Sequence, residues 1–325
     1  MVQTPLPALR RPALTAPTRD QPSGVDFIGH AGGAVRRLHG TPTRGHLEAA
    51  ASLRLLRLEV DVCSTSDEFM VLRHDTTVTP ANVVNPSARI PTGTRVADLS
   101  LADLRRLDPA LLTLDEAVEV LDGRVPLLLD IKGDATAGTL GDWLSRRRNG
   151  ADFAACTENR DALLHLRFAA PRTERWPSFP DIGDQRAGYV RRVLHELWLG
   201  HRDARHLGGS LVEIGRAVED ARNRPRNGVA RLAGLPWRNR LPRIIAERSA
   251  EVGAAALCIQ HWLITPEICA AAEKLGLPVT AWTVNDPAVA RRVVDCGVQR
   301  ITADNVDLLR CGLRVAGPAL GLHHL

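Results

Sequence analysis

The strongest constraint on the fold is a regular alternation of short apolar, β-branched segments with segments whose apolar residues recur at helical spacing. Such alternation is typical of a parallel sheet whose strands are joined by crossover helices. We expect strands at 26–30, 57–62, 68–73, 125–132, near 153–156, 255–260, 278–284 and 300–302. We expect helices at 46–56, 99–107, 113–121, 157–169, 265–275, 287–296 and 306–313.

Signals at the helix ends support this alternation. Thr113, followed three residues later by Glu116, matches a capping box, and Gly276 and Gly297 stand where helix C-caps belong. The pattern predicts an α/β protein whose sheet closes into an eight-stranded (β/α)8 TIM barrel. An open doubly wound sheet is the alternative, but the residues that follow the first strand, His30-Ala31-Gly32-Gly33, are not a G-x-G-x-x-G phosphate loop.

Length and composition agree with one barrel that carries additions. The chain has 325 residues, of which 44% are hydrophobic, and barrels of this type run to about 250 residues or more. We expect the barrel over 26–313, a disordered Pro-rich segment at 1–25 and a tail at 314–325. An unusual export signal is the alternative for the first segment. The six cysteines form no C-x-x-C pair, which favours reduced, buried thiols and a cytoplasmic location.

A basic stretch interrupts the alternation. Between Arg186 and Arg243, thirteen arginines stand against five acidic residues, and apolar residues recur at helical spacing. This pattern predicts a helical insertion at about 185–245, with a loop at 235–238. The insertion either packs on the barrel with a solvated arginine face or contacts anionic lipid headgroups at a membrane surface. No nucleic-acid-binding module is recognisable, so we expect no nucleic-acid partner.

Acidic and imidazole side chains stand at or near the ends of predicted strands. Glu59 and Asp61 belong to one strand and Asp130 to another, and His30 and His74 follow two further strands. Ionised carboxylates cannot be buried unpaired, because their desolvation costs several kcal/mol or more. A bound cation would satisfy all three acids together, which predicts a metal-dependent active site at the barrel mouth.

Lysine is rare in this chain. Of the 42 basic residues only Lys132 and Lys274 are lysines, and Lys132 ends the strand that contains Asp130. The ammonium group is a compact point charge, unlike the planar fork of arginine. We therefore expect Lys132 to act in the same site.

Several motifs occur in an order that resembles the glycerophosphodiester phosphodiesterase family. This family belongs to a wider class of barrel phosphodiesterases, with phosphatidylinositol phospholipase C and sphingomyelinase D. The similarity extends over about 26–309, apart from the basic stretch. The motifs are Gly29-His30, Glu59-Val60-Asp61, His74-Asp75, Thr113-Leu114-Asp115-Glu116-Ala117, Asp130-Ile131-Lys132, Ala281-Trp282-Thr283-Val284-Asn285 and Ile301-Thr302-Ala303-Asp304.

The resemblance implies a metal site. The family's E-x-D motif corresponds to Glu59 and Asp61, and its third metal carboxylate, usually a glutamate, corresponds to Asp130. It implies one divalent cation, Mg²⁺ or Ca²⁺, which oxygen ligands select. It also implies that Lys132 contacts the phosphate.

The resemblance implies histidine acid/base catalysis. The catalytic histidines correspond to His30 and His74, and Trp282 lies against the substrate. The relatives suggest that a substrate hydroxyl attacks phosphorus first and gives a cyclic phosphate, which water then opens. Imidazoles with ordinary pKa values near 6.5 suit both proton transfers, and the sequence leaves open which histidine is the base.

The chain departs from the family's H-R-G motif. Ala31 replaces the arginine that binds phosphate, as in sphingomyelinase D, which also lacks it and also has an aspartate as third ligand. Arg36, Arg37 and Arg73 are candidates to replace it, although alternation along the strand turns Arg73 away from His74.

Two functions remain open from the sequence. The first is a metal-dependent phosphoric diester hydrolase that acts on a glycerophosphodiester or a lipid-derived phosphodiester. The second is a catalytically silent barrel that binds an anionic ligand or lipid headgroup. The retention of His30, Glu59, Asp61 and His74 favours the enzyme.

Overall fold

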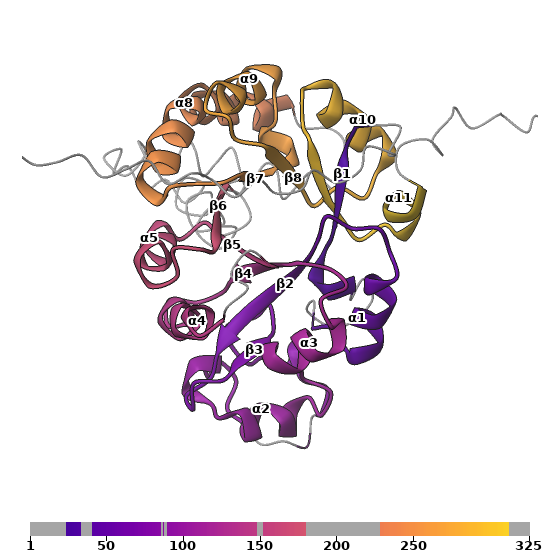
Figure 1. Cartoon of the computed structure of the whole chain (residues 1–325), viewed down its shortest axis with the longest axis vertical. Helices are drawn as coiled ribbons and strands as arrows, with labels where there is room; N and C mark the ends of the chain where they lie inside the picture. Colours follow the sequence, from indigo (N-terminus) through magenta and orange to yellow (C-terminus); the bar gives the residue numbers. More distant parts are fainter. Residues whose placement is uncertain are drawn as a thin grey trace, which may run out of the picture.

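Eight parallel strands form a closed barrel in the computed structural model of the chain (Figure 1). The structure describes residues 24–33, 41–85, 87, 90–147, 152–179 and 228–311. Strand β1 pairs with both β2 and β9, and this pairing closes the sheet. The barrel strands are β1 (Asp26–Gly29), β2 (Arg57–Ser64), β4 (Leu127–Ile131), β5 (Phe153–Thr157), β6 (Glu174–Phe179), β7 (Leu257–Gln260), β8 (Val279–Trp282) and β9 (Arg300–Ala303).

Helices surround the barrel and cover the outer face of its strands (Figure 1). Helices α1 and α3 pack against each other, as do α4 and α5, and α8 and α9. The helices are α1 (Arg44–Ala51), α2 (Leu101–Leu107), α3 (Leu114–Leu121), α4 (Thr136–Ser145), α5 (Arg160–Ala169), α8 (Gly228–Val252), α9 (Pro266–Lys274), α10 (Pro287–Asp295) and α11 (Val306–Cys311). The fold is therefore the predicted (β/α)8 TIM barrel. No helix in the described part is long and apolar enough to span a membrane.

One predicted barrel strand has another role. The segment at 68–73 forms β3 (Met70–Leu72), which pairs antiparallel with β2 and lies outside the barrel. The five residues that join β2 to β3 are too few for a parallel crossover, which needs a dozen or more. Glu68, with a φ of 65°, makes the tight turn. The hairpin brings the residues that follow β3 back over the barrel mouth.

Two elements lie where the sequence predicted none. Strand β6 contains Glu174, Arg175 and Pro177, which hide its strand pattern, and its Trp176 is fully buried inside the barrel. Helix α4 contains two glycines, and no side chain caps its N-terminus. Both elements are stabilised by packing rather than by local propensity.

The basic insertion lies mostly outside the described residues, which do not include 180–227. Its last part belongs to α8, so the loop predicted at 235–238 is wrong: these residues continue the helix. The C-terminal part of α8 buries Leu241 and Ile245 against the barrel core, and this packing stabilises the helix despite Pro236 and Pro242. The lipid contact predicted for 186–243 stays untested.

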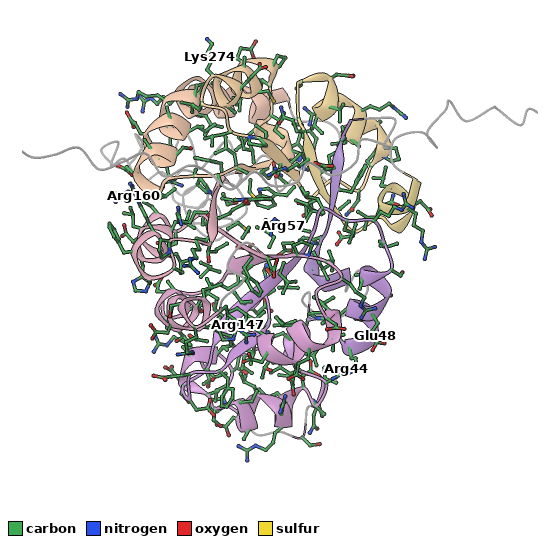
Figure 2. The ribbon with its side chains drawn as sticks, in the orientation of Figure 1. Arg44, Glu48, Arg57, Arg147, Arg160 and Lys274 are labelled. Atoms are coloured by element: carbon green, nitrogen blue, oxygen red, sulfur yellow. The ribbon has the colours of Figure 1, made fainter. Side chains whose placement is uncertain are left out.

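Charged side chains are distributed unevenly through the barrel. Figure 2 shows Arg57 near the centre of the molecule, whereas Arg160 and Lys274 lie at its periphery. Arg57 begins β2 and is 6% exposed. Most charged residues of a soluble protein lie in solvent, so the buried ones point to specific pairing or to function.

Candidate active site

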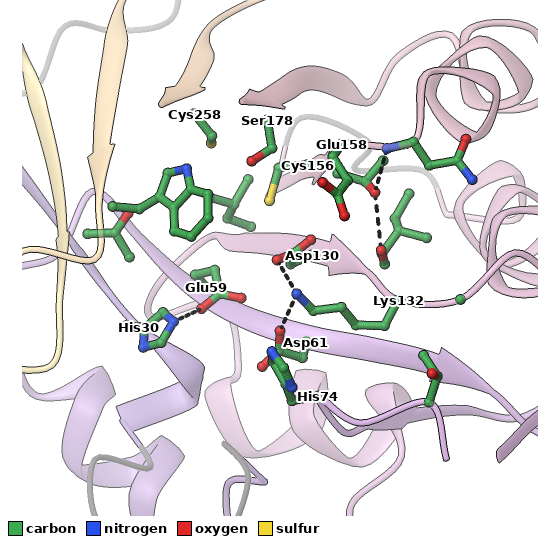
Figure 3. A pocket seen from close by; sticks show the side chains of 18 of the residues that line it. His30, Glu59, Asp61, His74, Asp130, Lys132, Cys156, Glu158, Ser178 and Cys258 are labelled. Atoms are coloured by element: carbon green, nitrogen blue, oxygen red, sulfur yellow. Dashed lines mark hydrogen bonds and ion pairs between the residues drawn. The ribbon is translucent and has the colours of Figure 1, made fainter. Parts of the chain in front are cut away.

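A cavity of 570 Å³ opens at the carboxyl ends of the barrel strands. Catalytic residues of TIM barrels lie at this end. All seven residues that the sequence assigns to the site line the cavity, and Figure 3 shows most of them converging on its centre. These residues are His30, Glu59, Asp61, His74, Asp130, Lys132 and Trp282.

Three carboxylates form the centre of the site, of which Glu59 and Asp61 are buried and Asp130 is half-buried. Glu59 and Asp61 lie two residues apart on β2, so both point to the barrel interior, and Asp61 is in register with Asp130 on β4. Each of the three offers a carboxylate oxygen, and these oxygens lie within 4.8 Å of one another. Glu59 Oε1 and Asp61 Oδ2 are buried and have no hydrogen-bond partner among the described residues.

This arrangement is electrostatically costly without a cation. Burial and the nearby charge of Asp61 raise the pKa of Glu59 to about 8. Burial also raises the pKa of Asp130, with a further contribution from Asp61. Oxygen ligands bind Ca²⁺ at 2.3–2.6 Å and Mg²⁺ at slightly shorter distances, so oxygens this close can share one ion. The residues present therefore fit a hard divalent cation.

Lys132 bridges two of the acids. Its Nζ lies 2.7 Å from Asp130 Oδ2 and 3.1 Å from Asp61 Oδ1. Burial opposes its charge, but the two carboxylates keep the pKa of Lys132 well above its ordinary value. The ammonium group stays protonated beside Asp61 and Asp130, where it can also contact an anionic ligand.

His30 is held in one orientation by a turn and a carboxylate. It follows β1, and its Nδ1 lies 2.7 Å from Asp304 Oδ1, while its Nε2 lies 3.9 Å from Glu59 Oε2. Burial opposes a charged imidazole, but the Asp304 hydrogen bond and the charge of Glu59 outweigh it and raise the pKa of His30 to about 9. Only Nε2 remains available for a ligand in the cavity.

The turn after His30 also supports Glu59. Ala31 and Gly32 have positive φ values of 48° and 62°. This conformation directs the Ala31 backbone N–H to Glu59 Oε2 at 2.7 Å. A Cβ on Gly32 would meet the Pro42 side chain at 2.7 Å, so only glycine fits there.

His74 reaches the site from the hairpin rather than from a barrel strand. It follows β3, and its Nδ1 lies 2.9 Å from Asp75 Oδ1. Asn82 in turn donates to Asp75 Oδ2 at 2.8 Å. His74 is more exposed than His30, with 54% of its side chain accessible against 33%. In the view of Figure 3, His30 lies next to Glu59, whereas His74 lies below Asp61.

The arginine that Ala31 replaces has no substitute among the described residues that line the cavity, where Lys132 is the one lysine or arginine. Arg73 is 2% exposed and donates to the backbone carbonyls of Asp75 and Asn82. Arg36 and Arg37 lie outside the described residues. Lys132 therefore supplies the positive side-chain charge within the described cavity, apart from the histidines.

Comparison with protein families identifies the chain. The model of the glycerophosphoryl diester phosphodiesterase family matches residues 43–308. The chain belongs to the glycerophosphoryl diester phosphodiesterase family. Members of this family are enzymes, and this chain is accordingly a phosphoric diester hydrolase of the glycerophosphodiester phosphodiesterase type. No curated protein matches the sequence.

Solved structures of glycerophosphodiester phosphodiesterases share the fold. A phosphodiesterase of Oleispira antarctica, solved with the product sn-glycerol-3-phosphate, is 17% identical with a TM-score of 0.56; the match covers 86% of this chain and 92% of that chain. The enzyme of Thermotoga maritima is 16% identical with a TM-score of 0.55; the match covers 87% of this chain and 96% of that chain. At such identities these likenesses establish the barrel and not the roles of individual residues.

The phosphodiesterase site also contains residues that sequence reasoning left without a role. Asp304 orients His30, and Asn285 holds Asp304 through Nδ2 to Oδ2 and through Oδ1 to the Asp304 N–H, both at 2.7 Å. Both residues close family motifs, and their positions after β8 and β9 were the available signal. Glu158 also lines the cavity after β5, and no motif marked it.

Proposed function

We propose that the chain is a divalent-metal-dependent phosphodiesterase that cleaves glycerophosphodiesters. The observation that carries this proposal is the convergence of Glu59, Asp61 and Asp130 within 4.8 Å, with two buried oxygens that lack a partner among the described residues. A buried acceptor without a partner is costly. Three acids that include two such oxygens, at the mouth of a barrel, are therefore better explained by a bound cation than by a contribution to stability.

Glu59, Asp61 and Asp130 would hold the cation, for which Mg²⁺ and Ca²⁺ are the candidates. When bound, such a cation draws negative charge from a non-bridging phosphate oxygen and lowers the barrier to attack on phosphorus. Lys132 would add positive charge near the phosphate, because its ammonium group lies against Asp61 and Asp130 in the proposed metal site.

His30 and His74 would transfer the protons. Each has its Nδ1 engaged by a carboxylate, Asp304 or Asp75. Each therefore presents Nε2 to a substrate. One imidazole takes the proton of the attacking hydroxyl as the bond to phosphorus forms, and the other gives a proton to the departing alcohol oxygen as its bond to phosphorus breaks. Attack by a substrate hydroxyl yields a cyclic phosphate, and water yields the open monoester.

The substrate class follows from the family and from one relative. The Oleispira antarctica phosphodiesterase structure holds the product sn-glycerol-3-phosphate. A catalytically silent barrel is less consistent with the retained pairs His30–Asp304 and His74–Asp75, which a mere binding protein does not need. A cytoplasmic location and a peripheral membrane contact through 186–243 belong to the same proposal.

The test is hydrolysis of a glycerophosphodiester by the purified chain, followed by ³¹P NMR, with EDTA and then with Mg²⁺ or Ca²⁺ restored. We expect turnover only with the metal. A cyclic phosphate seen by ³¹P NMR would indicate attack by the substrate hydroxyl, and its absence would indicate direct attack by water. Titration of the metal-free protein with each cation should raise the melting temperature. Full activity in EDTA, or no activity with any divalent cation, would refute the proposal.

A further inference from the structure

The cavity contains one carboxylate that the proposed chemistry does not use. Glu158 follows β5 and directly precedes Asn159, the N-cap of α5. Thr157 fixes this strand end, because its Oγ1 donates to the Ile131 carbonyl and accepts from the Asn159 N–H, each at 3.2 Å. Figure 3 shows Glu158 in the cavity wall beyond Asp130, away from His30.

The Glu158 carboxylate has no hydrogen bond or ion pair within the described ranges. Lys132, a nearby cation, is already engaged by Asp61 and Asp130. Arg248 reaches the backbone carbonyl of Glu158 at 3.4 Å, but its guanidinium lies over the Phe179 ring. Burial raises the pKa of Glu158, which the charge of Lys132 partly offsets. A half-buried carboxylate without a partner favours a cationic ligand group.

The charge of the whole cavity points the same way. Its described lining contains five carboxylates and one lysine, together with His30 and His74. One divalent cation and one phosphodiester add a single net positive charge. The occupied cavity thus stays negative even when both histidines are protonated. A substrate with a positive group is attracted to this cavity, and one with a further negative group is repelled.

The cavity also offers an aromatic ring. Trp282, the last residue of β8, lines the cavity together with the small apolar side chains of Cys156 and Cys258. Ammonium groups bind over the face of tryptophan, especially when they carry methyl groups. The carboxylate and the ring come from β5 and β8, so they lie on different walls.

We propose that Glu158 is a specificity-determining residue that selects phosphodiesters in which one alcohol carries an ammonium group. This inference rests on the proposed phosphodiesterase activity. The ammonium group lies between the carboxylate of Glu158 and the ring of Trp282, while the phosphate lies over Glu59, Asp61 and Asp130. Glycerophosphodiesters of amino alcohols then react faster than those of neutral polyols.

The test compares kcat/KM for two matched substrates, the glycerophosphodiesters of choline and of glycerol, in wild type, Glu158→Gln and Glu158→Lys. The wild type prefers the choline ester. Glu158→Gln lowers the choline-to-glycerol ratio about tenfold, mainly through KM for the choline ester, and Glu158→Lys lowers it further. Glu273→Gln, an exposed substitution on α9, keeps the wild-type ratio.

The outcomes separate this inference from the proposed function. If the wild type cleaves neither diester with metal present, the proposed function fails. If the wild type cleaves both diesters and Glu158→Gln changes kcat/KM equally for the two, the specificity role of Glu158 is overturned while the proposed function stands. Repeating the comparison with the monoacyl lipid of each headgroup shows whether the ammonium substrate is a soluble diester or a lipid.

Discussion

The barrel contains two groups of buried and half-buried charges, one at each end, and they differ in how far they are paired within the protein. At the amino ends of the strands, which we call the lower cluster, lie Arg57, Glu174, Trp176 and Arg300. Glu174 Oε2 accepts from Arg57 at 3.2 Å and from the Trp176 indole at 3.0 Å. Arg57 and Arg300 lie over the Trp176 ring, 5.5 and 4.9 Å from its centre. These charges have partners within the protein, although one nitrogen of Arg300 has none among the described residues.

At the carboxyl ends, the carboxylates of Glu59, Asp61 and Asp130 outnumber their cation. Lys132 contacts two of them, and two carboxylate oxygens remain without a partner within the described chain. A buried charge is tolerated when it has a partner, whereas an excess of one sign lowers the stability of the fold and creates affinity for a ligand of the opposite charge. We infer from this contrast that the lower cluster stabilises the barrel, whereas the charges of Glu59, Asp61, Asp130 and Lys132 are arranged to bind a ligand.

The sharpest test of this contrast is Asp61→Asn. The substitution removes one carboxylate of the proposed metal site, so activity should fall by about 10³-fold, since electrostatic stabilisation is usually the largest catalytic contribution. It also removes repulsion with Glu59, while Lys132 keeps its closer contact with Asp130, so the metal-free protein should melt at a higher temperature. Steady-state kinetics and thermal melts in EDTA measure both effects, with exposed Asp142→Asn as control. Lower stability with normal activity would reverse the assignment of the two ends.

The second test concerns the histidines above the carboxylates. His30→Ala and His74→Ala should each lower kcat by about 10²-fold, because each removes a proton transfer. Exposed His165→Ala on α5 is the matched control. Circular dichroism should show an intact fold in all three variants. Near-normal turnover in either cavity variant would remove that histidine from the mechanism.

The third test uses pH to expose the uncompensated charge. The pKa of Glu59 is raised from 4.5 in the unfolded chain to about 8 in the folded protein. Between these two pH values the folded protein therefore binds a proton on Glu59 that the unfolded chain does not bind. Stability should therefore fall as pH rises towards 8. His30, with its pKa raised from 6.5 to about 9, adds stability below pH 6.5 that is lost as pH rises through 9. Both effects have the same sign.

Melting curves at pH 5.5 and pH 8.5 measure this effect. The metal-free protein should melt about 5 °C lower at pH 8.5, and Mg²⁺ or Ca²⁺ should raise the melting temperature more at pH 8.5 than at pH 5.5, since deprotonated ligands bind better. Equal metal effects at both pH values would argue against a cation on Glu59.

The fourth test addresses the lower cluster. Glu174→Gln removes the ion-pair partner of buried Arg57 and should cost about 2 kcal/mol of unfolding free energy, since a buried ion loses its partner. The specific activity of the folded fraction should not change, because Glu174 is far from the cavity lining. Urea denaturation, with exposed Glu119→Gln as control, measures the loss. A catalytic defect without destabilisation would contradict the contrast.

The sequence predicted the barrel and the seven cavity residues because both depend on local signals. Apolar runs of strand length and motifs at strand ends are read directly from the chain. Strand β6 was missed because its polar residues are explained by distant contacts: Glu174 accepts from Arg57, 117 positions away, and Arg175 donates to the Val252 carbonyl, 77 positions away. The hairpin origin of His74 depends on the short β2–β3 connection, a signal present in the sequence but outweighed by the apolar pattern of β3.

Supporting residues were harder to predict than the ligands. Asp304 lies 274 positions from His30, so only the closed barrel, which places β9 beside β1, brings them together. Glu158 belongs to an unremarkable Thr-Glu-Asn segment, and only the cavity reveals it. Pairings across the closure of a barrel are long-range properties that no local pattern encodes.

The smallest predicted effect concerns Asp304, which does not follow the difference between the two ends of the barrel. It lies at the carboxyl end of the barrel, yet both of its oxygens have partners, as in the lower cluster: Oδ1 lies 2.7 Å from His30 Nδ1 and Oδ2 accepts from Asn285 at 2.7 Å. We infer that it positions His30. Asp304→Asn should lower kcat about tenfold and leave KM nearly unchanged, because the imidazole loses its charged partner and its preferred tautomer.

Substrates with different leaving groups distinguish a positioning role of Asp304 from a merely structural one. If His30 protonates the departing alcohol, the defect of Asp304→Asn should largely disappear with a 4-nitrophenyl phosphodiester, whose phenolate leaves without a proton. If His30 instead takes the proton of the attacking hydroxyl, the defect should be the same for both leaving groups, with the fold intact. The exposed variant Asp307→Asn on α11 should show neither effect. A loss in Asp304→Asn that simply follows its melting temperature would place Asp304 with the lower cluster, as a residue that maintains the barrel.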